Sequence, residues 1–166
     1  SKMIKTFFKI DQGDENFKKY KNQFLSEYKL NLTKNSRLFV GMKLLIQYLD
    51  NNSIMYGVVT NKYFEYAEPI IKSFKELRNL KVIICPDHVS ISKPDPEGIL
   101  LACKKLDVAP NNTIYLGDHI NDLIAGQAAG TKVLGCLYGY SLDEKILKSH
   151  GFTYVNNVSE IISHID

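Results

Sequence analysis

The sequence of 166 residues has no tryptophan, only three cysteines and no apolar run long enough to cross a membrane. A membrane-spanning helix needs about 20 consecutive apolar residues, so the sequence contains no candidate span. Cys85, Cys103 and Cys136 share no metal-binding spacing and fall within apolar segments. An odd number of such buried-looking thiols indicates a reducing compartment. We therefore expect a cytoplasmic protein.

The sequence also lacks a strong excess of charge of either sign. It has 21 lysines and arginines against 18 acidic residues, for a net charge of +3, and the lysines are dispersed. A nucleic-acid-binding protein usually concentrates its basic residues on one face. A composition of 45% apolar and 23% charged residues is typical of one globular domain. We expect neither a nucleic-acid nor a membrane partner, and the sequence leaves the oligomeric state open.

Short apolar strands alternate with amphipathic helices along the chain. The predicted strands cover 54–60, 81–85, 113–116, 132–137 and Tyr154-Val155, and the predicted helices cover 42–49, 63–77, 97–106, 121–129, 142–149 and 158–165. Alternation at these lengths predicts an α/β fold with a doubly wound parallel sheet.

Two aspartates follow the third predicted strand. Asp118 comes directly after Gly117, and Asp122 lies four residues later, in the first turn of a predicted helix. Both carboxylates should face the crevice at the carboxyl end of the sheet. Mg²⁺ takes one or two protein carboxylates and completes its octahedron with water and phosphate oxygens. The same pattern also fits a turn aspartate followed by one that stabilises a helix N-terminus.

Two polar groups upstream favour the metal-site interpretation. Thr60 and Asn61 end a β-branched strand, and Lys93 stands directly before Pro94 at a helix start. Ligand-binding groups of open α/β sheets occupy such positions. The transfer of a phosphoryl group needs fixed hydrogen-bond donors, a cation and a metal. A hydroxyl and a backbone N–H would supply the donors, and an ammonium group would supply the cation.

Taken in order, Thr60-Asn61, Lys93-Pro94 and Asp118 with Asp122 resemble the second, third and fourth motifs of the haloacid dehalogenase superfamily, most closely its phosphoglycolate phosphatase branch. The resemblance implies a Rossmann-like core and Mg²⁺-dependent hydrolysis of a small phosphorylated metabolite through an aspartyl-phosphate. It implies that Thr60, Asn61 and Lys93 bind the phosphate, with Thr60 and Lys93 acting in catalysis. Asp118 would ligate Mg²⁺, and Asp122 would hold a metal-bound water or orient Lys93.

The nucleophile motif of that superfamily, Asp-x-Asp-Gly-Thr, is absent from the sequence. The nearest candidate is Asp11, but Gly13 stands where the second aspartate should be. Residues 1–35 resemble instead the tail of a helical cap, and 36–166 resemble a hydrolase core without its first, central strand. We therefore expect the C-terminal portion of a longer protein, inactive alone and poorly soluble because two strand edges would be exposed.

Three alternatives stay open. A sugar-phosphate phosphatase or a β-phosphoglucomutase would use the same core, because the cap chooses between such substrates. A degenerate homologue could bind phosphate or Mg²⁺ without catalysis. A two-component receiver domain shares the fold, but its acidic pair precedes its threonine and lysine, whereas Asp118 and Asp122 come last here.

Overall fold

The structure is a computed structural model that describes residues 6, 9 and 13–165. The chain divides into two compact units, Ser1–Ser36 and Arg37–Asp166. Asp11, the nearest candidate for a nucleophile, lies outside the described residues. None of the helices in the described part is long and apolar enough to cross a membrane.

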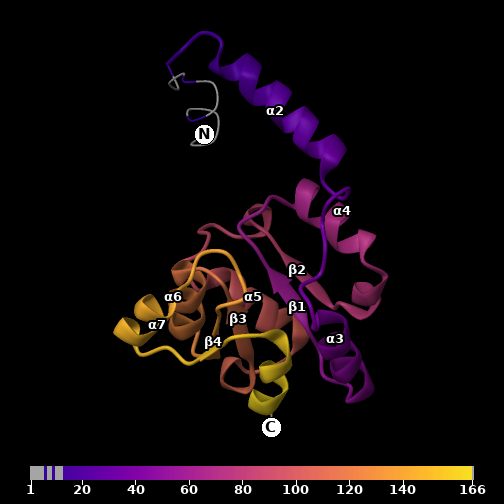
Figure 1. The fold of residues 1–166 in the computed structure, drawn as a ribbon, viewed down its shortest axis with the longest axis vertical. Helices are drawn as coiled ribbons and strands as arrows, with labels where there is room; N and C mark the ends of the chain where they lie inside the picture. Colours follow the sequence, from indigo (N-terminus) through magenta and orange to yellow (C-terminus); the bar gives the residue numbers. More distant parts are fainter. Residues whose placement is uncertain (1–5, 7–8, 10–12, 166) are drawn as a thin grey trace. The chain divides into compact units, whose positions relative to one another are not determined.

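The first unit contains helix α2, Phe17–Asn31 (Figure 1). Five apolar or aromatic side chains recur at helical spacing and are half-buried, namely Phe17, Tyr20, Phe24, Leu25 and Tyr28. Leu30 is exposed, and no residue of the helix is fully buried. Two of the five, Phe24 and Tyr28, stack with ring centroids 6.2 Å apart. The helix therefore has an apolar face, and its assignment to a cap stays a prediction.

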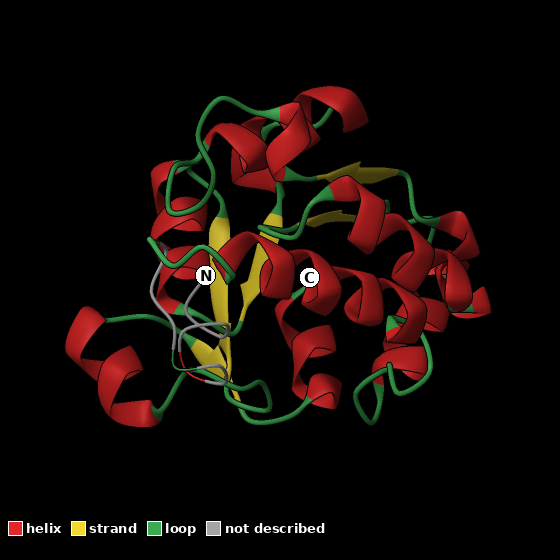
Figure 2. Cartoon of the chain, turned by 90° about the horizontal axis from the view of Figure 1, so that it is seen from above, coloured by secondary structure: helices red, strands yellow, loops and turns green. Residues whose placement is uncertain are grey.

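The second unit contains five short parallel strands in two separate sheets. The strands are β1 Gly57–Val59, β2 Val82–Ile84, β3 Ile114–Gly117, β4 Lys132–Cys136 and β5 Tyr154–Val155. β1 pairs with β2, and β3, β4 and β5 form the other sheet in that order. Figure 2 shows the two groups of strands with helices around them. Within the described residues, no strand joins β1 to β3.

Helices cover both faces of these sheets. The α-helices are α3 Met42–Asn51, α4 Phe64–Ser73, α5 Glu97–Leu106, α6 Ile120–Ala128 and α7 Glu144–His150. The 3₁₀-helices are η1 Lys75–Asn79, η2 Pro86–His88, η3 Pro110–Asn112 and η4 Val158–His164. Helix α5 packs on β1 and β2, helix α6 packs on β3 and β4, and α3 contacts η4 (Figure 1).

The buried side chains form a core on each side of the strands. Between α5 and α6, Ile99 and Cys103 pack against Ala125 and Ala129. A second cluster joins α3, β4, β5 and η4, and consists of Leu45, Cys136, Val155, Val158 and Ile161. Apolar burial on both faces is the arrangement of a doubly wound α/β fold, which confirms the predicted fold class.

Three predicted elements differ in extent. The strand predicted over 54–60 is β1 alone, because only Gly57–Val59 pairs with β2. The helix predicted over 63–77 ends at Ser73, where Phe74 adopts extended backbone angles, and η1 follows. Pro69 lies inside α4 and does not begin it. The helix predicted over 158–165 is the 3₁₀-helix η4.

Candidate active site

The Lys93 ammonium has three close oxygen partners. Its Nζ atom lies 2.8 Å from Asp122 Oδ1, 2.8 Å from the Val59 carbonyl oxygen and 3.0 Å from the Tyr115 hydroxyl. These partners match the three N–H donors of the group. The Lys93 side chain is only 9% exposed. The cation is therefore held in one orientation at the end of β1.

The surroundings of Lys93 keep it charged. Burial lowers the pKa of Lys93, but the hydrogen bonds to Tyr115 and Asp122 and the negative charge of Asp122 outweigh this effect and raise the pKa above its usual value. Burial also raises the pKa of Tyr115, although the neighbouring Lys93 opposes this. At neutral pH the pair is therefore an ammonium beside a neutral phenol.

The loop before α5 is anchored by the first residue of that helix. The Glu97 carboxylate accepts hydrogen bonds from the Ser90 and Ile91 backbone N–H groups, at 2.9 to 3.0 Å. The Asn61 side-chain amide donates to the Lys93 carbonyl oxygen at 3.1 Å. These bonds join the Lys93 loop to α5 on one side and to the end of β1 on the other.

Thr60, Asn61 and Lys93 line one small hollow of about 10 Å³, close to the space that a single water molecule needs. The Thr60 hydroxyl oxygen accepts a hydrogen bond from the Lys62 backbone N–H at 3.1 Å. Because a hydroxyl can accept and donate at once, Thr60 keeps its proton for a further acceptor. The structure thus brings these three sequence-predicted residues together.

The contacts of Asp122 agree with the orientation of Lys93 and with the stabilisation of a helix N-terminus, while its metal role stays a prediction. Its Oδ1 atom pairs with Lys93, and its Oδ2 atom accepts a hydrogen bond from the His119 backbone N–H at 3.1 Å. His119 is the N-cap of α6 and its Nδ1 atom accepts from the Asn121 N–H. A Cβ atom on Gly117 would lie 2.2 Å from Asp122 Cβ, so this close approach requires glycine.

Asp118 contacts the loop that follows β4. Its Oδ2 atom accepts a hydrogen bond from the Tyr140 backbone N–H at 3.0 Å. A Cβ atom on Gly139 would lie 2.2 Å from Asp118 Cβ, so glycine is required here too. Burial raises the pKa of the Cys136 thiol, and the charges of Asp118 and Asp122 raise it further. Both carboxylates therefore lie near the same buried thiol.

The two aspartates suit a hard cation better than a zinc ion. Within the described residues, no group of three His, Cys, Asp or Glu side chains is placed to hold a metal, as structural zinc would require. Mg²⁺ needs fewer protein ligands and retains water. Asp122 already uses both oxygens, whereas the contacts above leave Oδ1 of Asp118 available. The donor set fits Mg²⁺ on Asp118, with Asp122 beside it.

The site also includes three residues that the sequence did not predict, Tyr115, Glu97 and Tyr140. Tyr115 is separated by 22 residues from Lys93 and by 56 residues from Val59, to whose carbonyl its hydroxyl donates at 3.4 Å. No local pattern relates positions so far apart. The available signal was the position of Tyr115 in β3, two residues before Gly117.

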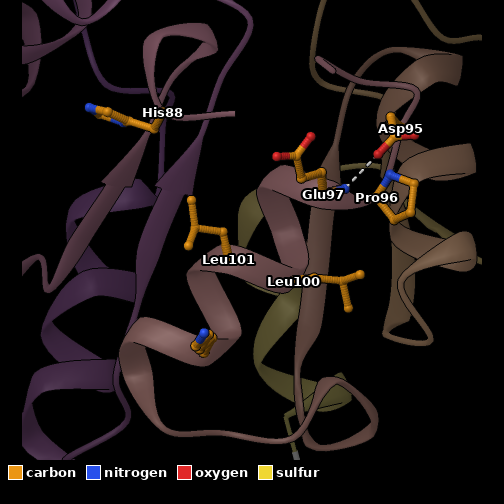
Figure 3. A pocket seen from close by; sticks show the side chains of 7 residues that line it. His88, Asp95, Pro96, Glu97, Leu100 and Leu101 are labelled. Atoms are coloured by element: carbon orange, nitrogen blue, oxygen red, sulfur yellow. Dashed lines mark hydrogen bonds between the residues drawn. The ribbon is translucent and has the colours of Figure 1, made fainter. Parts of the chain in front are cut away.

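A larger hollow beside α5 is lined in part by Glu97, but not by Lys93, Asp118 or Asp122. It measures about 510 Å³ and includes Asp95, Glu97, Leu100 and Lys104. Figure 3 shows these side chains, with the Asp95 carboxylate accepting a hydrogen bond from the Glu97 N–H. None of the residues predicted for the site lines this hollow.

Comparison with known proteins decides the family. The family model described as haloacid dehalogenase-like hydrolase matches residues 1–136, well over half of the chain. The chain belongs to the haloacid dehalogenase-like hydrolase family.

Two curated relatives of this haloacid dehalogenase-like chain are phosphatases. It is 38% identical over 138 residues to N-acetylmuramic acid 6-phosphate phosphatase of Pseudomonas putida, covering 83% of this chain and 62% of that protein. It is 29% identical over 138 residues to phosphoglycolate phosphatase of Photorhabdus laumondii, covering 83% of this chain and 59% of that protein. The chain thus spans about three fifths of the length of the curated relatives it matches.

A solved structure gives the same result for the fold. The crystal structure of a predicted phosphoglycolate phosphatase from Haemophilus somnus superposes with a TM-score of 0.86 and 25% identity. The match covers 99% of this chain and 73% of that one. The superfamily resemblance read from Thr60, Lys93 and Asp118 is therefore confirmed, while the roles of the individual residues stay predictions.

Proposed function

We propose that this site hydrolyses a phosphate monoester in the complete protein, with Mg²⁺ as cofactor and a small phosphorylated metabolite as substrate. The main support for the proposal is the burial and orientation of Lys93. Its side chain is 9% exposed, and its ammonium group contacts Asp122, Val59 and Tyr115. A buried, oriented cation costs no reorganisation when negative charge develops on a transferring phosphoryl group.

Each residue has a role in this proposal. The Thr60 hydroxyl and the Asn61 backbone N–H donate to the nonbridging phosphoryl oxygens, and Lys93 compensates their negative charge. Asp118 would hold Mg²⁺, and Asp122 fixes Lys93. When bound, Mg²⁺ neutralises phosphoryl oxygens and orients the substrate.

The reaction also needs a carboxylate nucleophile within reach of Lys93. Its oxygen forms a bond to phosphorus while the ester P–O bond breaks. A general acid in the same upstream segment gives its proton to the leaving alcohol oxygen and regains one from the attacking water in the second step. Water then cleaves the aspartyl-phosphate, which releases phosphate and restores the carboxylate. We place this nucleophile on an upstream strand between β1 and β3. The separation of the two sheets supports this position. The Val59 carbonyl supports it too, because its oxygen accepts hydrogen bonds from the Lys93 and Tyr115 side chains and from no strand among the described residues.

The names of two relatives indicate one narrow chemical class of substrate. The relatives at 38% and 29% identity are named for N-acetylmuramic acid 6-phosphate and for phosphoglycolate. Both names describe small anionic phosphate monoesters. We assign that class to this site and place the activity in the cytoplasm, because Cys85, Cys103 and Cys136 are all free thiols in the interior.

A second candidate is a non-catalytic protein that binds phosphate or Mg²⁺. One observation favours it: among the described residues, Asp122 is the carboxylate that pairs with Lys93, and it also caps α6. A carboxylate with one oxygen in an ion pair and the other accepting a hydrogen bond is a poor nucleophile. Under this alternative the chain would bind phosphate without turnover.

The deciding experiment measures hydrolysis of p-nitrophenyl phosphate, phosphoglycolate and a sugar 6-phosphate, with and without Mg²⁺. It compares this chain with an extended protein that includes the upstream segment of the same reading frame. We expect Mg²⁺-dependent turnover in the extended protein only, abolished by Lys93→Ala and kept in Lys104→Ala, a lysine on the larger hollow beside α5. Turnover by the short chain would contradict the upstream nucleophile, and phosphate binding without turnover in both forms would support the second candidate.

A further inference from the structure

The segment that leads to Lys93 has little apolar packing of its own. Val89, just before it, packs against the buried side chains of β2 and α5. Ser90 is exposed, and Ile91 is 58% exposed. We call residues 90–93 the Lys93 loop. Since burial does not fix Ser90 and Ile91, their position depends on polar contacts.

The Glu97 carboxylate supplies these contacts. Its Oε1 atom accepts the Ser90 N–H at 2.9 Å, and its Oε2 atom accepts the Ser90 N–H at 3.0 Å and the Ile91 N–H at 2.9 Å. Hydrogen bonds to an ionised acceptor are stronger than those between neutral groups. The same bonds lower the pKa of Glu97, so the carboxylate is ionised at neutral pH.

Glu97 itself stands on a part of the fold that packing fixes. The next residue, Gly98, is buried, and a Cβ atom there would lie 3.0 Å from Val59 Cγ1 and 3.5 Å from Ile84 Cγ2. The first turn of α5 therefore lies directly on β1 and β2. The Asp95 carboxylate also accepts the Glu97 N–H at 2.9 Å (Figure 3). Glu97 thus ties the Lys93 loop to the strands below α5.

The orientation of the Lys93 ammonium depends on this attachment. A lysine side chain is a flexible four-carbon stem, so its charge has a fixed position only where the backbone and the ammonium partners are both fixed. Lys93 follows Ile91 by two residues, and on its other side the Asn61 amide donates to the Lys93 carbonyl oxygen at 3.1 Å. Glu97 and Asn61 together hold the backbone from which Lys93 reaches Asp122.

We propose that Glu97 is a positioning residue of the site, whose carboxylate holds the Lys93 loop where the ammonium can act on the phosphoryl group. This inference rests on the proposed hydrolase function and adds a residue that acts through Lys93. Glu97 does not touch the substrate. It lines the larger hollow beside α5, whereas Thr60, Asn61 and Lys93 line the small one.

The test combines two measurements on the extended protein, amide hydrogen exchange of Ser90 and Ile91 and steady-state hydrolysis of p-nitrophenyl phosphate. Glu97→Ala should speed exchange of both N–H groups at least about tenfold, because the loop opens more often. It should lower kcat about tenfold and leave KM within about twofold, because a displaced cation chiefly loses contact with the charge that develops in the transition state. Glu97→Gln keeps one acceptor oxygen and should keep kcat within about threefold.

Glu160 offers the matched control. Its carboxylate also holds the segment before a helix, accepting the Asn156 N–H at 2.9 Å and the Asn157 side-chain amide at 2.6 Å. None of the Lys93 contacts involves it. Glu160→Ala should lower the melting temperature about as much as Glu97→Ala and leave kcat unchanged. The comparison separates the positioning of Lys93 from a general loss of stability.

Three results would overturn the inference alone. The first is unchanged exchange of Ser90 and Ile91 in Glu97→Ala, and the second is faster exchange with an unchanged kcat. The third is an equal fall of kcat in Glu97→Ala and Glu160→Ala. Each of them leaves the hydrolase function intact. Failure of the unsubstituted extended protein to hydrolyse any phosphate ester would instead overturn the proposed function, and this inference with it.

Discussion

The Lys93 ammonium lies 2.8 Å from the Asp122 carboxylate, and the two side chains are only 9% and 14% exposed. A nearly buried ion pair of this kind is sensitive to the loss of one partner, because the remaining charge keeps its desolvation penalty. The same pair orients the proposed catalytic cation. Stability and activity should therefore respond together when it is changed.

A double-mutant cycle measures this coupling. Asp122→Asn should destabilise the extended protein by about 2–4 kcal/mol, because Lys93 would lose its only ion-pair partner among the described residues. Adding Lys93→Met should recover part of this loss, with a coupling of about 1–3 kcal/mol. Urea unfolding gives these values.

The exposed pair Lys148 and Glu144, with side chains 64% and 54% exposed, is the matched control for this cycle. Its members should show little coupling. Strictly additive effects of Asp122→Asn and Lys93→Met would contradict the importance of the buried pair.

Asp118 should control Mg²⁺ binding. Asp118→Asn replaces a charged ligand by a neutral one, so we expect Mg²⁺ affinity to fall at least about tenfold and turnover at least about a hundredfold. Titration calorimetry with Mg²⁺ and the Mg²⁺ dependence of kcat test this. Asp107→Asn is the control, because Asp107 adopts the left-handed conformation that asparagine also tolerates. Unchanged Mg²⁺-dependent turnover in Asp118→Asn would refute the metal role.

Tyr115 should position Lys93 without touching the substrate. Tyr115→Phe removes the hydroxyl that lies 3.0 Å from Lys93 Nζ, so we expect kcat to fall about five- to tenfold with KM nearly unchanged. The hydroxyl accepts one hydrogen bond from Lys93 and donates a longer one to the Val59 carbonyl, so their loss should cost about 1–3 kcal/mol of stability. Tyr63→Phe, at a side chain 57% exposed, is the control for loss of a phenol hydroxyl. A larger effect on KM than on kcat would argue for direct substrate contact instead.

Gly139 should be intolerant of any side chain. A Cβ atom there would lie 2.2 Å from Asp118 Cβ, so Gly139→Ala must move either the carboxylate or the loop. We expect weaker Mg²⁺ binding and turnover about tenfold or more lower, because small displacements at a reacting centre are costly. Gly13→Ala, where a Cβ would meet nothing within 4 Å, is the control. Full activity of Gly139→Ala would show that the contact with Asp118 is dispensable.

Tyr56 should make stability fall in strongly alkaline solution. Burial, together with the hydrogen bond to Asp50 at 3.1 Å, raises the pKa of Tyr56 to about 12. Because this pKa lies above the ordinary value of about 10, the stabilisation is complete below pH 10 and is lost as the pH rises toward 12. Tyr56→Phe should flatten stability between pH 10 and 12 in urea unfolding. A pKa of Tyr56 near 10 in difference titration of the two proteins would contradict this.

Much of the fold followed from local patterns. The alternation of strand and helix predicted the α/β class, and the predicted helix 97–106 coincides with α5 because a proline pair precedes it and Asp107 ends it in a left-handed conformation. The predicted ends of β1 and of α4 were wrong. A strand extends only where a neighbouring strand pairs with it, and a helix ends where its tertiary contacts end. Such limits depend on residues distant in the chain.

The candidate site was likewise predicted in part from the sequence and decided in part by the tertiary structure. Thr60, Lys93, Asp118 and Asp122 could be named from the sequence, because each residue type stands at the end of a strand or the start of a helix where ligands bind. The resemblance implied that Asp122 could orient Lys93, and the two side chains do pair. Only the tertiary structure showed that the other Asp122 oxygen accepts the His119 N–H at the start of α6, and that the Tyr140 N–H donates to Asp118. Secondary structure follows from neighbouring residues, whereas side-chain pairing depends on which segments packing brings within about 3 Å.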